Sequence, residues 1–128
     1  MPEEVRVTRA GDLKASGPQT EGMIRQAALV DVSDQVCGTL MIAKPHTASA
    51  VHHHGEEDTI VYCVSGHGSI VSGPNGSKRE DLSPGDWALI PSFAEHQEVN
   101  DSDGDIVWVI CRGGRTPIVE NLQSWTKS

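Results

Sequence analysis

The sequence contains few aromatic residues, few basic residues and no long apolar run. Only 4% of its 128 residues are aromatic, and 10 Lys and Arg stand against 18 Asp and Glu, for a formal charge of −8. This acidity repels phosphate backbones, so we expect no nucleic acid partner. All apolar runs are shorter than the ~18 residues of a membrane-spanning helix, so we expect no membrane partner either.

Cysteine is also scarce, and its distribution excludes a disulfide scaffold. Cys37, Cys63 and Cys111 are odd in number, far apart and embedded in apolar runs, whereas a disulfide-stabilised domain has an even and denser set. We expect all three to be small buried core residues of a cytoplasmic protein. Residues 1–4 show neither the basic nor the apolar region of a secretory signal, which agrees with that location.

Glycine and proline are abundant, and they separate short apolar runs. The chain has 13 Gly and 7 Pro, a mix typical of short elements joined by tight turns. The runs are Met23–Val32, Val36–Ala43, Thr59–Val64, Gly68–Ser72, Trp87–Ile90 and Ile106–Cys111. The last run is short and rich in β-branched side chains, which favours a strand. Residues 72–77, Ser-Gly-Pro-Asn-Gly-Ser, predict a hairpin loop.

These features predict a single all-β domain, a small barrel or sandwich, of 13.7 kDa. Residues 1–20 are polar and interrupted by Gly11, Gly17 and Pro18, so we expect an N-terminal tail or edge segment there. The barrel is expected over residues 21–128, with a C-terminal extension that begins at about residue 113.

Three of the six histidines stand in one run, His52-His53-His54. Because side chains alternate faces along a strand, His52 and His54 point to one side and His53 to the other. Two imidazoles ~6–7 Å apart on one strand face can bind a single metal ion through Nε2 atoms at ~2.0–2.1 Å. The run therefore predicts a metal site.

A third histidine, His96, lies downstream of the predicted hairpin. A partner strand can bring it alongside the first two. Three convergent neutral imidazoles suit a first-row transition metal, so we expect one divalent ion per chain, which could be Fe, Mn, Ni, Zn or Cu. His46 and His67 are each isolated in the sequence, and we expect them at the surface.

At these residues the sequence resembles the cupin superfamily. The second cupin motif, G-x5-P-x-G-x2-H-x3-N, is matched by Gly85, Pro91, His96 and Asn100 at the right spacing. Phe93 takes the place of the second glycine of this motif. Together with the first motif, the resemblance covers about residues 36–112, which is most of the domain.

The first cupin motif, G-x5-H-x-H-x(3,4)-E-x6-G, is matched in part. His52, His54 and Gly66 stand at motif positions, and His46 takes the place of the leading glycine. Two motifs in the right order, separated by a predicted hairpin, make the resemblance specific.

The glutamate of the first motif has no direct counterpart. Counted back from Gly66 its position falls on Thr59, and counted forward from His54 with the shorter spacing it falls on Asp58. Either the three histidines hold the metal with water or substrate in the open positions, or the acidic run brings a carboxylate into place. Glu57 shares strand parity with Thr59 if the segment is extended, so we expect it to be the fourth ligand, or the catalytic acid/base if it falls short. The expected ligands are His52, His54, Glu57 and His96.

The resemblance implies a cupin-type conical β-barrel, the double-stranded β-helix or jelly-roll fold, with the metal in the barrel mouth. Cupin barrels are usually closed or extended by dimerisation, so a homodimer is expected. If Thr59 faces inward, as its motif position implies, Val61 and Cys63 line a largely apolar cavity below the metal, which is typical of a small-molecule site.

A metal ion held by three neutral imidazoles keeps open positions for an enolate, a β-diketone or a hydroxy acid. The resemblance then implies a metal-dependent enzyme with a small organic substrate, acting as a dioxygenase or as a non-redox lyase, isomerase or decarboxylase. A non-catalytic module that binds a small molecule or a metal is the alternative. A structural dimer with a vestigial site is a third reading, which predicts no metal.

Overall fold

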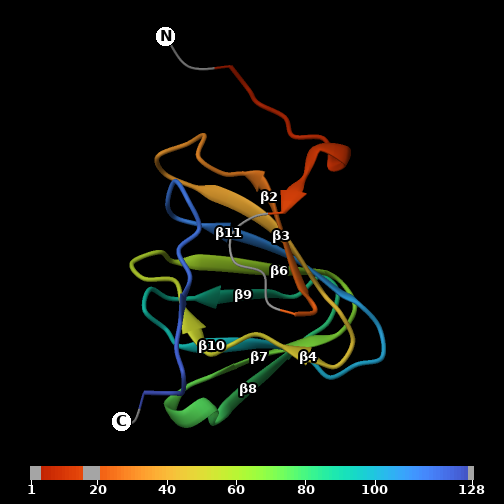
Figure 1. Cartoon of the computed structure of the whole chain (residues 1–128), viewed down its shortest axis with the longest axis vertical. Coiled ribbons are helices and arrows are strands. Elements are labelled where there is room, and N and C mark those ends of the chain that lie inside the picture. Colours follow the sequence, from red (N-terminus) through yellow and green to blue (C-terminus); the bar gives the residue numbers. More distant parts are fainter. Residues whose placement is uncertain (1–3, 16–20, 127–128) are drawn as a thin grey trace.

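The structure, a computed structural model, describes residues 4–15 and 21–126, and it consists almost entirely of β-strands (Figure 1). The strands are β1 (Lys14–Ala15), β2 (Met23–Leu29), β3 (Cys37–Ala43), β4 (Thr47–Ala48), β5 (His52–His53), β6 (Thr59–Ser65), β7 (Gly68–Ser72), β8 (Lys78–Leu82), β9 (Trp87–Ile90), β10 (His96–Asn100), β11 (Ile106–Arg112) and β12 (Glu120–Asn121). Two short 3-10 helices occur in the described residues, η1 (Ala10–Asp12) and η2 (Pro74–Gly76). Neither of these helices is long and apolar enough to cross a membrane.

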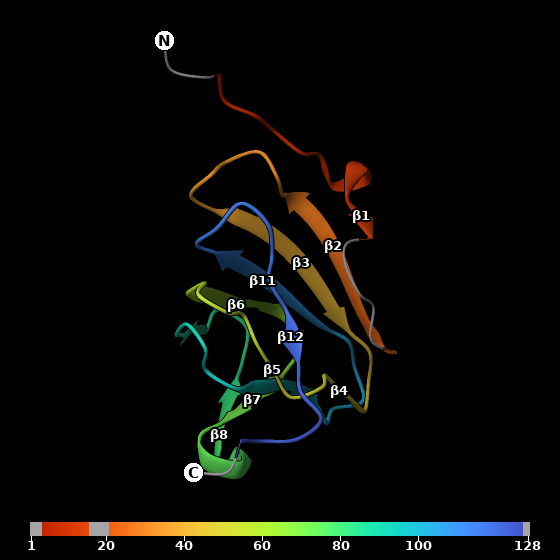
Figure 2. The same cartoon turned by 60° about the vertical axis from the view of Figure 1, so that its left-hand side comes forward.

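The described strands form two antiparallel sheets that pack against each other (Figures 1 and 2). The first sheet has the order β1-β2-β3-β11-β6-β9, and the second has the order β12-β5-β10-β7-β8, with β4 paired to β10. Neighbours that are distant in sequence are the mark of a jelly roll, which confirms the predicted fold class. In the described part of the chain β8 and β9 share no ladder, so hydrogen bonding does not close the sheets into the continuous barrel we expected.

One hydrophobic core fills the space between the sheets. Strands β3 and β11 alternate between inward and outward residues, as expected for strands buried on one face. Trp108 is fully buried at the centre, in contact with a cluster that includes Ile70 of the second sheet. Thr59, Val61 and Cys63 face inward, which is one of the two orientations that the sequence left open. Val61 and Cys63 belong to this packed core.

The turns that the motifs require are present even where the motif glycines are absent. Gly66, directly after β6, has a φ of +82°, and a Cβ there would lie 2.4 Å from the carbonyl oxygen of Asp105. His46 and Phe93, which stand in place of motif glycines, also have positive φ values of 56° and 60°. The chain thus keeps the left-handed backbone at both positions, at a cost that glycine would avoid.

The three cysteines do not share one environment. Cys37 and Cys63 are buried and unpaired, as predicted, but Cys111 is exposed. Cys111 takes an outward position in the alternation of β11, so its burial in the core, which we expected, is wrong.

The chain after β11 returns across the second sheet (Figure 2). Residues 113–126, called the C-terminal segment below, place β12 beside β5, with Asn121 opposite His52. Arg112 donates a hydrogen bond from Nη1 to the carbonyl oxygen of Ile118 at 2.7 Å. The segment therefore supplies one of the two neighbours of the short strand that carries His52.

Candidate metal centre

Three imidazoles meet in the interior of the fold. His52 lies on β5, His54 follows directly after β5, and His96 opens β10 opposite His52. The ring centroids are 5.2 Å apart for His52 and His54, 4.2 Å for His52 and His96, and 4.7 Å for His54 and His96. None of the three is more than 2% exposed. The structure thus brings together the three histidines that the sequence singles out.

The Nδ1 atom of each ring faces an oxygen acceptor. The carbonyl oxygen of Ala50 lies 2.7 Å from Nδ1 of His52, and that of Ala94 lies 2.9 Å from Nδ1 of His96. Nδ1 of His54 lies 2.8 Å from Oγ1 of Thr59. Because carbonyl oxygens only accept, His52 and His96 carry their proton on Nδ1, which leaves the Nε2 lone pair free in the neutral ring.

The Nε2 atoms are buried and poorly satisfied. Those of His54 and His96 have no hydrogen-bond partner in the described part of the chain. Such orphaned buried atoms are costly unless a ligand satisfies them. The ligand atoms of His52, His54 and His96 and a carboxylate oxygen of Glu98 all lie within 4.8 Å of one another.

Glu98 is the acidic member of this cluster. It lies two residues after His96 on β10, so both side chains share the inward face of the strand. Its two oxygens lie 3.4 Å from Nε2 of His52 and of His96, which is about the spacing of two ligands on one tetrahedral ion. Ser49 donates to the carboxylate at 3.0 Å and accepts from the Glu98 amide at 3.0 Å.

Burial and the neighbouring charges shift the pKa values of the cluster in different directions. Burial, followed by the nearby charge of Arg112, lowers the pKa of His54 to about 2, so this ring stays neutral. Burial raises the pKa of Glu98, but the imidazoles of His52 and His96 outweigh burial and hold it well below its usual range. Burial likewise lowers the pKa of His96, but Glu98 makes the net shift upward. The raised pKa favours a proton on His96, which a bound cation would displace.

Glu57 lies apart from the cluster, although it is buried. Its parity with Thr59 depends on an extended segment, but residues 55 and 56 form a turn that is closed by a hydrogen bond from the Glu57 amide to the His54 carbonyl at 3.1 Å. Oε1 of Glu57 accepts a hydrogen bond from the Ile118 amide at 3.0 Å. The carboxylate packs against Gly114, where a Cβ would lie 2.0 Å from Oε2. The structure thus places Glu57 against the C-terminal segment.

Arg112 is a buried cation near the cluster. It is 5% exposed, and its Nε has no hydrogen-bond partner among the residues described. Burial lowers the pKa of its guanidinium, and the charges of Glu98 and Glu57 oppose that shift. Two carboxylates and one guanidinium leave one net negative charge around the imidazoles, and a divalent ion would turn it into one positive charge.

The remaining motif residues have structural partners. Asn100 is fully buried and donates to the carbonyl oxygens of Ala43, Lys44 and Gly104 at 2.8–3.0 Å. Asp58 accepts a hydrogen bond from the Ser92 amide. These hydrogen bonds hold the loops that lie next to the histidine-bearing strands.

The other histidines lie outside the cluster. His53 points away from it, as the alternation predicted, and its Nε2 lies 3.2 Å from a carboxylate oxygen of Glu120. His46 and His67 are exposed, as expected.

Sequence reasoning missed Glu98. The signal was available, because the spacing His96-Gln97-Glu98 repeats the period of two that pairs His52 with His54. The acidic run at residues 56–58 competed with it, being nearer in sequence to the first two histidines.

The donor set fits a transition metal. Three imidazole nitrogens and one carboxylate oxygen are ligands of the kind that zinc, iron, manganese, nickel and copper accept. These residues, His52, His54, His96 and Glu98, could therefore hold one ion.

A family model described as a cupin domain matches residues 39–111. No curated protein matches the chain by sequence. Several solved structures share the fold, all with low sequence identity.

The polyketide cyclase RemF from Streptomyces resistomycificus is 21% identical, with a TM-score of 0.72 over 95% of this chain and 86% of that one. A protein with a double-stranded β-helix domain from Klebsiella pneumoniae is 18% identical, with a TM-score of 0.74 over 94% and 99%. Oxalate decarboxylase from Lactobacillus farciminis is 19% identical, with a TM-score of 0.75 over 88% of this chain and 34% of that one. The chain thus spans about a third of the decarboxylase.

Proposed function

The chain belongs to the cupin family, and we propose that it is a metal-dependent enzyme that acts on a small organic substrate. One divalent transition metal ion would be held by His52, His54, His96 and Glu98. The observation that carries the proposal is the pair of buried Nε2 atoms, of His54 and His96, that have no hydrogen-bond partner among the described residues and are oriented by their Nδ1 contacts beside a buried carboxylate.

The charge of the site favours a substrate with an anionic oxygen. With a divalent ion present, the buried groups around the imidazoles carry one net positive charge, which an enolate, a β-diketonate or a carboxylate of a hydroxy acid would neutralise. The buried Nε of Arg112, which has no hydrogen-bond partner among the described residues, would offer such an oxygen a further donor. Such a substrate would bind through one or two oxygens at positions that the protein leaves open.

Of the two classes of reaction, oxygenation by a dioxygenase and a non-redox reaction, we favour the non-redox class. Enzymes with a similar fold include a polyketide cyclase and an oxalate decarboxylase. The net positive charge of the loaded site would stabilise the oxygen of an enolate as it forms. A bound ion supplies that stabilisation as a Lewis acid. A lyase, isomerase, cyclase or decarboxylase reaction on an enolisable or hydroxy-acid substrate therefore fits best.

The residues of the chain would orient the substrate, exclude water and move a proton. The histidines are held by Ala50, Thr59 and Ala94, so their rings keep one direction as a substrate binds. Glu57 remains our candidate for the acid/base group because it is buried and carries a carboxylate. In that role it would exchange its hydrogen bond to Ile118 for one to the substrate.

Elemental analysis of tag-free protein tests the proposal, with wild type beside His96→Ala. About one equivalent of one metal per chain, absent from the variant, is the expected result. The loaded protein is then offered β-diketones and 2-hydroxy acids, and NMR spectroscopy in D2O follows proton exchange, cleavage and isomerisation. No metal in the wild type, even after reconstitution, would refute the metal site.

Two other results would assign the site to the alternatives. Iron in the wild type together with oxygen uptake on a diketone would identify a dioxygenase. Metal and tight binding of a small molecule without turnover would identify a binding module.

We also propose that the protein forms a homodimer through the outer face of the first sheet. Ile60, Val64, Trp87 and Leu89 are between 45% and 69% exposed there. They lie on neighbouring strands, since Ile60 pairs with Leu89 and Tyr62 with Trp87. A second copy would cover this apolar patch, as monomeric proteins rarely leave such patches open.

A further inference from the structure

A small cavity lined in part by His96 lies at the seam between the two sheets. It has a volume of about 140 Å³ and lies between β7 and β8 on one side and β9 on the other. Its apolar lining residues include Ile70, Ala88, Ile90 and Ala94, and His96 also lines it. The seam exists because β8 and β9 are the last strands of their sheets and do not pair in the described residues.

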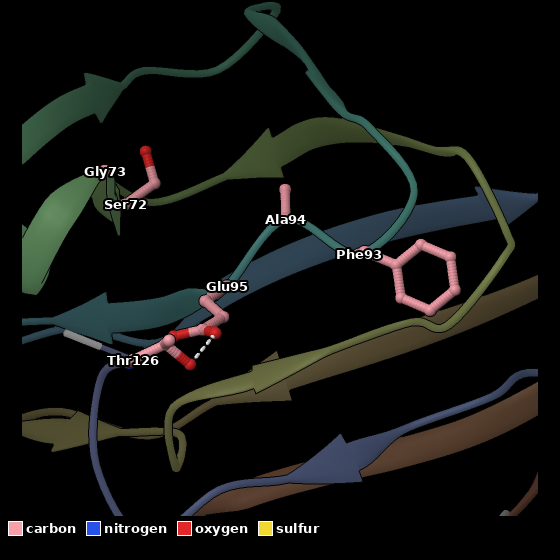
Figure 3. Close-up of a pocket in the computed structure, with 6 residues that line it drawn as sticks. All are labelled: Ser72, Gly73, Phe93, Ala94, Glu95 and Thr126. Atoms are coloured by element: carbon pink, nitrogen blue, oxygen red, sulfur yellow. Dashed lines mark hydrogen bonds between the residues drawn. The ribbon is translucent and has the colours of Figure 1, made fainter. Parts of the chain in front are cut away.

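A second, wider cavity adjoins the first at the surface. It has a volume of about 340 Å³, and Ser72 and Ala94 line both cavities. Figure 3 shows this outer cavity, with Ala94 between Phe93 and Glu95 on the loop before β10. Glu95 is hydrogen-bonded to Thr126 of the C-terminal segment. A ligand in the outer cavity would therefore lie beside Ser72 and Ala94, which also line the cavity at His96.

The inner cavity suits an apolar group of limited size. Apolar side chains make up most of its lining, beside Ser72 and His96, and an engineered apolar cavity of about 150 Å³ stays dry and binds benzene. Two alanines, Ala88 and Ala94, leave this space open. Two charged residues, Lys78 and Glu80, also line the cavity, but both are exposed. Nζ of Lys78 lies 3.7 Å from Oε1 of Glu80, so the two charges pair at the surface end of the cavity.

From this geometry we infer that the inner cavity is the subsite for an apolar group of the substrate, of at most one six-membered ring. The oxygen-bearing end of the same molecule would bind at the metal centre, since His96 belongs to both sites. This inference rests on the proposed function and adds the substrate class: an aromatic or branched aliphatic diketone or hydroxy acid. Ala88 and Ala94 would then set the size limit.

Two probes that differ by one ring test the subsite. Mandelate and glycolate are both 2-hydroxy acids, and only mandelate carries a phenyl group. The zinc-loaded wild type is expected to bind mandelate at least about tenfold more tightly, because the phenyl group leaves water. Ala88→Leu fills the cavity, so it should remove this preference while zinc content and glycolate binding stay unchanged. Ala48→Leu, an exposed substitution on β4, is the matched control.

A second measurement needs neither the metal nor a variant. Benzene added to the metal-free wild type should shift the methyl signals of Ala88, Ala94 and Ile70 in NMR spectra and leave that of Ala48 in place. Unshifted signals with benzene, or equal affinities for mandelate and glycolate, would overturn the subsite. A preference that survives in a folded Ala88→Leu variant would also overturn it, since the ring would then bind elsewhere.

The two proposals fail in different ways. If elemental analysis finds no metal but benzene still shifts these signals, the proposed function and the link between the cavity and a substrate are both refuted. If zinc binds but mandelate binds no more tightly than glycolate, only the subsite is refuted.

Discussion

Oγ1 of Thr59 lies 2.8 Å from Nδ1 of His54. Thr59 stands where the first cupin motif would place its glutamate, yet here the side chain orients a histidine. The carboxylate nearest the imidazoles comes from Glu98 on β10. The acidic group thus lies on β10, the strand that also carries His96. Thr59, at the motif position on β6, contacts His54 through Nδ1, the nitrogen that faces away from the cluster.

Exchanging the two buried glutamates one at a time tests which of them is a ligand. Glu98→Gln should weaken zinc binding about tenfold to a hundredfold, because it removes the negative charge of the proposed fourth ligand. Glu57→Gln should leave zinc affinity unchanged, since Glu57 bonds to Ile118. Zinc titration against a competing chelator measures both. The reverse order of effects would make Glu57 the fourth ligand.

The hydroxyl of Ser49 should matter to the metal through Glu98. Ser49→Ala removes the hydrogen bond to the Glu98 carboxylate, so the carboxylate loses its fixed direction and zinc affinity should fall about tenfold. Ser69→Ala is the matched control, because Ser69 is also buried but bonds to Asp81 on β8. Equal losses in both variants would show that Ser49 acts only through stability.

Acid should destabilise the metal-free protein in part through His54. Its pKa is about 2 in the folded state and ~6.5 in the unfolded chain. Between these values the unfolded chain binds a proton at His54 and the folded protein does not, so the free energy of unfolding decreases as the pH falls below ~6.5. The slope is at most about 1.4 kcal/mol per pH unit for this one group.

The variant His54→Gln isolates this contribution. Urea unfolding of the wild type and of the variant, at about pH 7 and about pH 5, gives the difference in stability at each pH. The wild type should lose more stability than the variant on acidification. Equal losses would mean that His54 titrates in the folded state as it does in the unfolded one.

A methyl group at Gly66 should destabilise the fold. Gly66→Ala places a Cβ 2.4 Å from the Asp105 carbonyl oxygen at a φ of +82°, so the free energy of unfolding should fall by about 1–3 kcal/mol. Gly104→Ala is the control, because a Cβ there meets no atom within 4 Å. Chemical denaturation of both variants measures the difference, and equal stabilities would contradict the close approach at Gly66.

A charge on the outer face of the first sheet should separate the proposed dimer. Light scattering should give the wild type a mass of twice 13.7 kDa. Leu89→Lys puts a cation into the apolar patch, so the variant should be monomeric or dissociate at a much higher concentration. Leu40→Lys, on the same sheet but two strands away from β6, shows how far the interface extends. A monomeric wild type would refute the dimer.

Much of the fold followed from local sequence patterns. The strands at Thr59–Ser65 and Ile106–Arg112 were anticipated within one residue of their ends, because their alternation and β-branched side chains act locally. The hairpin at residues 72–77 was also anticipated, and Asn75 there has a φ of 55°, as its turn chemistry allows.

The sequence by itself determined the three histidines, because the period of two along a strand places His52 and His54 on one face and the second motif marks His96. Only the tertiary structure decided the acidic partner. The turn at residues 55–56 directs Glu57 to Ile118, whereas the register that sets His96 opposite His52 places Glu98 beside the same histidines. Register between strands depends on long-range pairing and on the facing sheet, which no local spacing encodes.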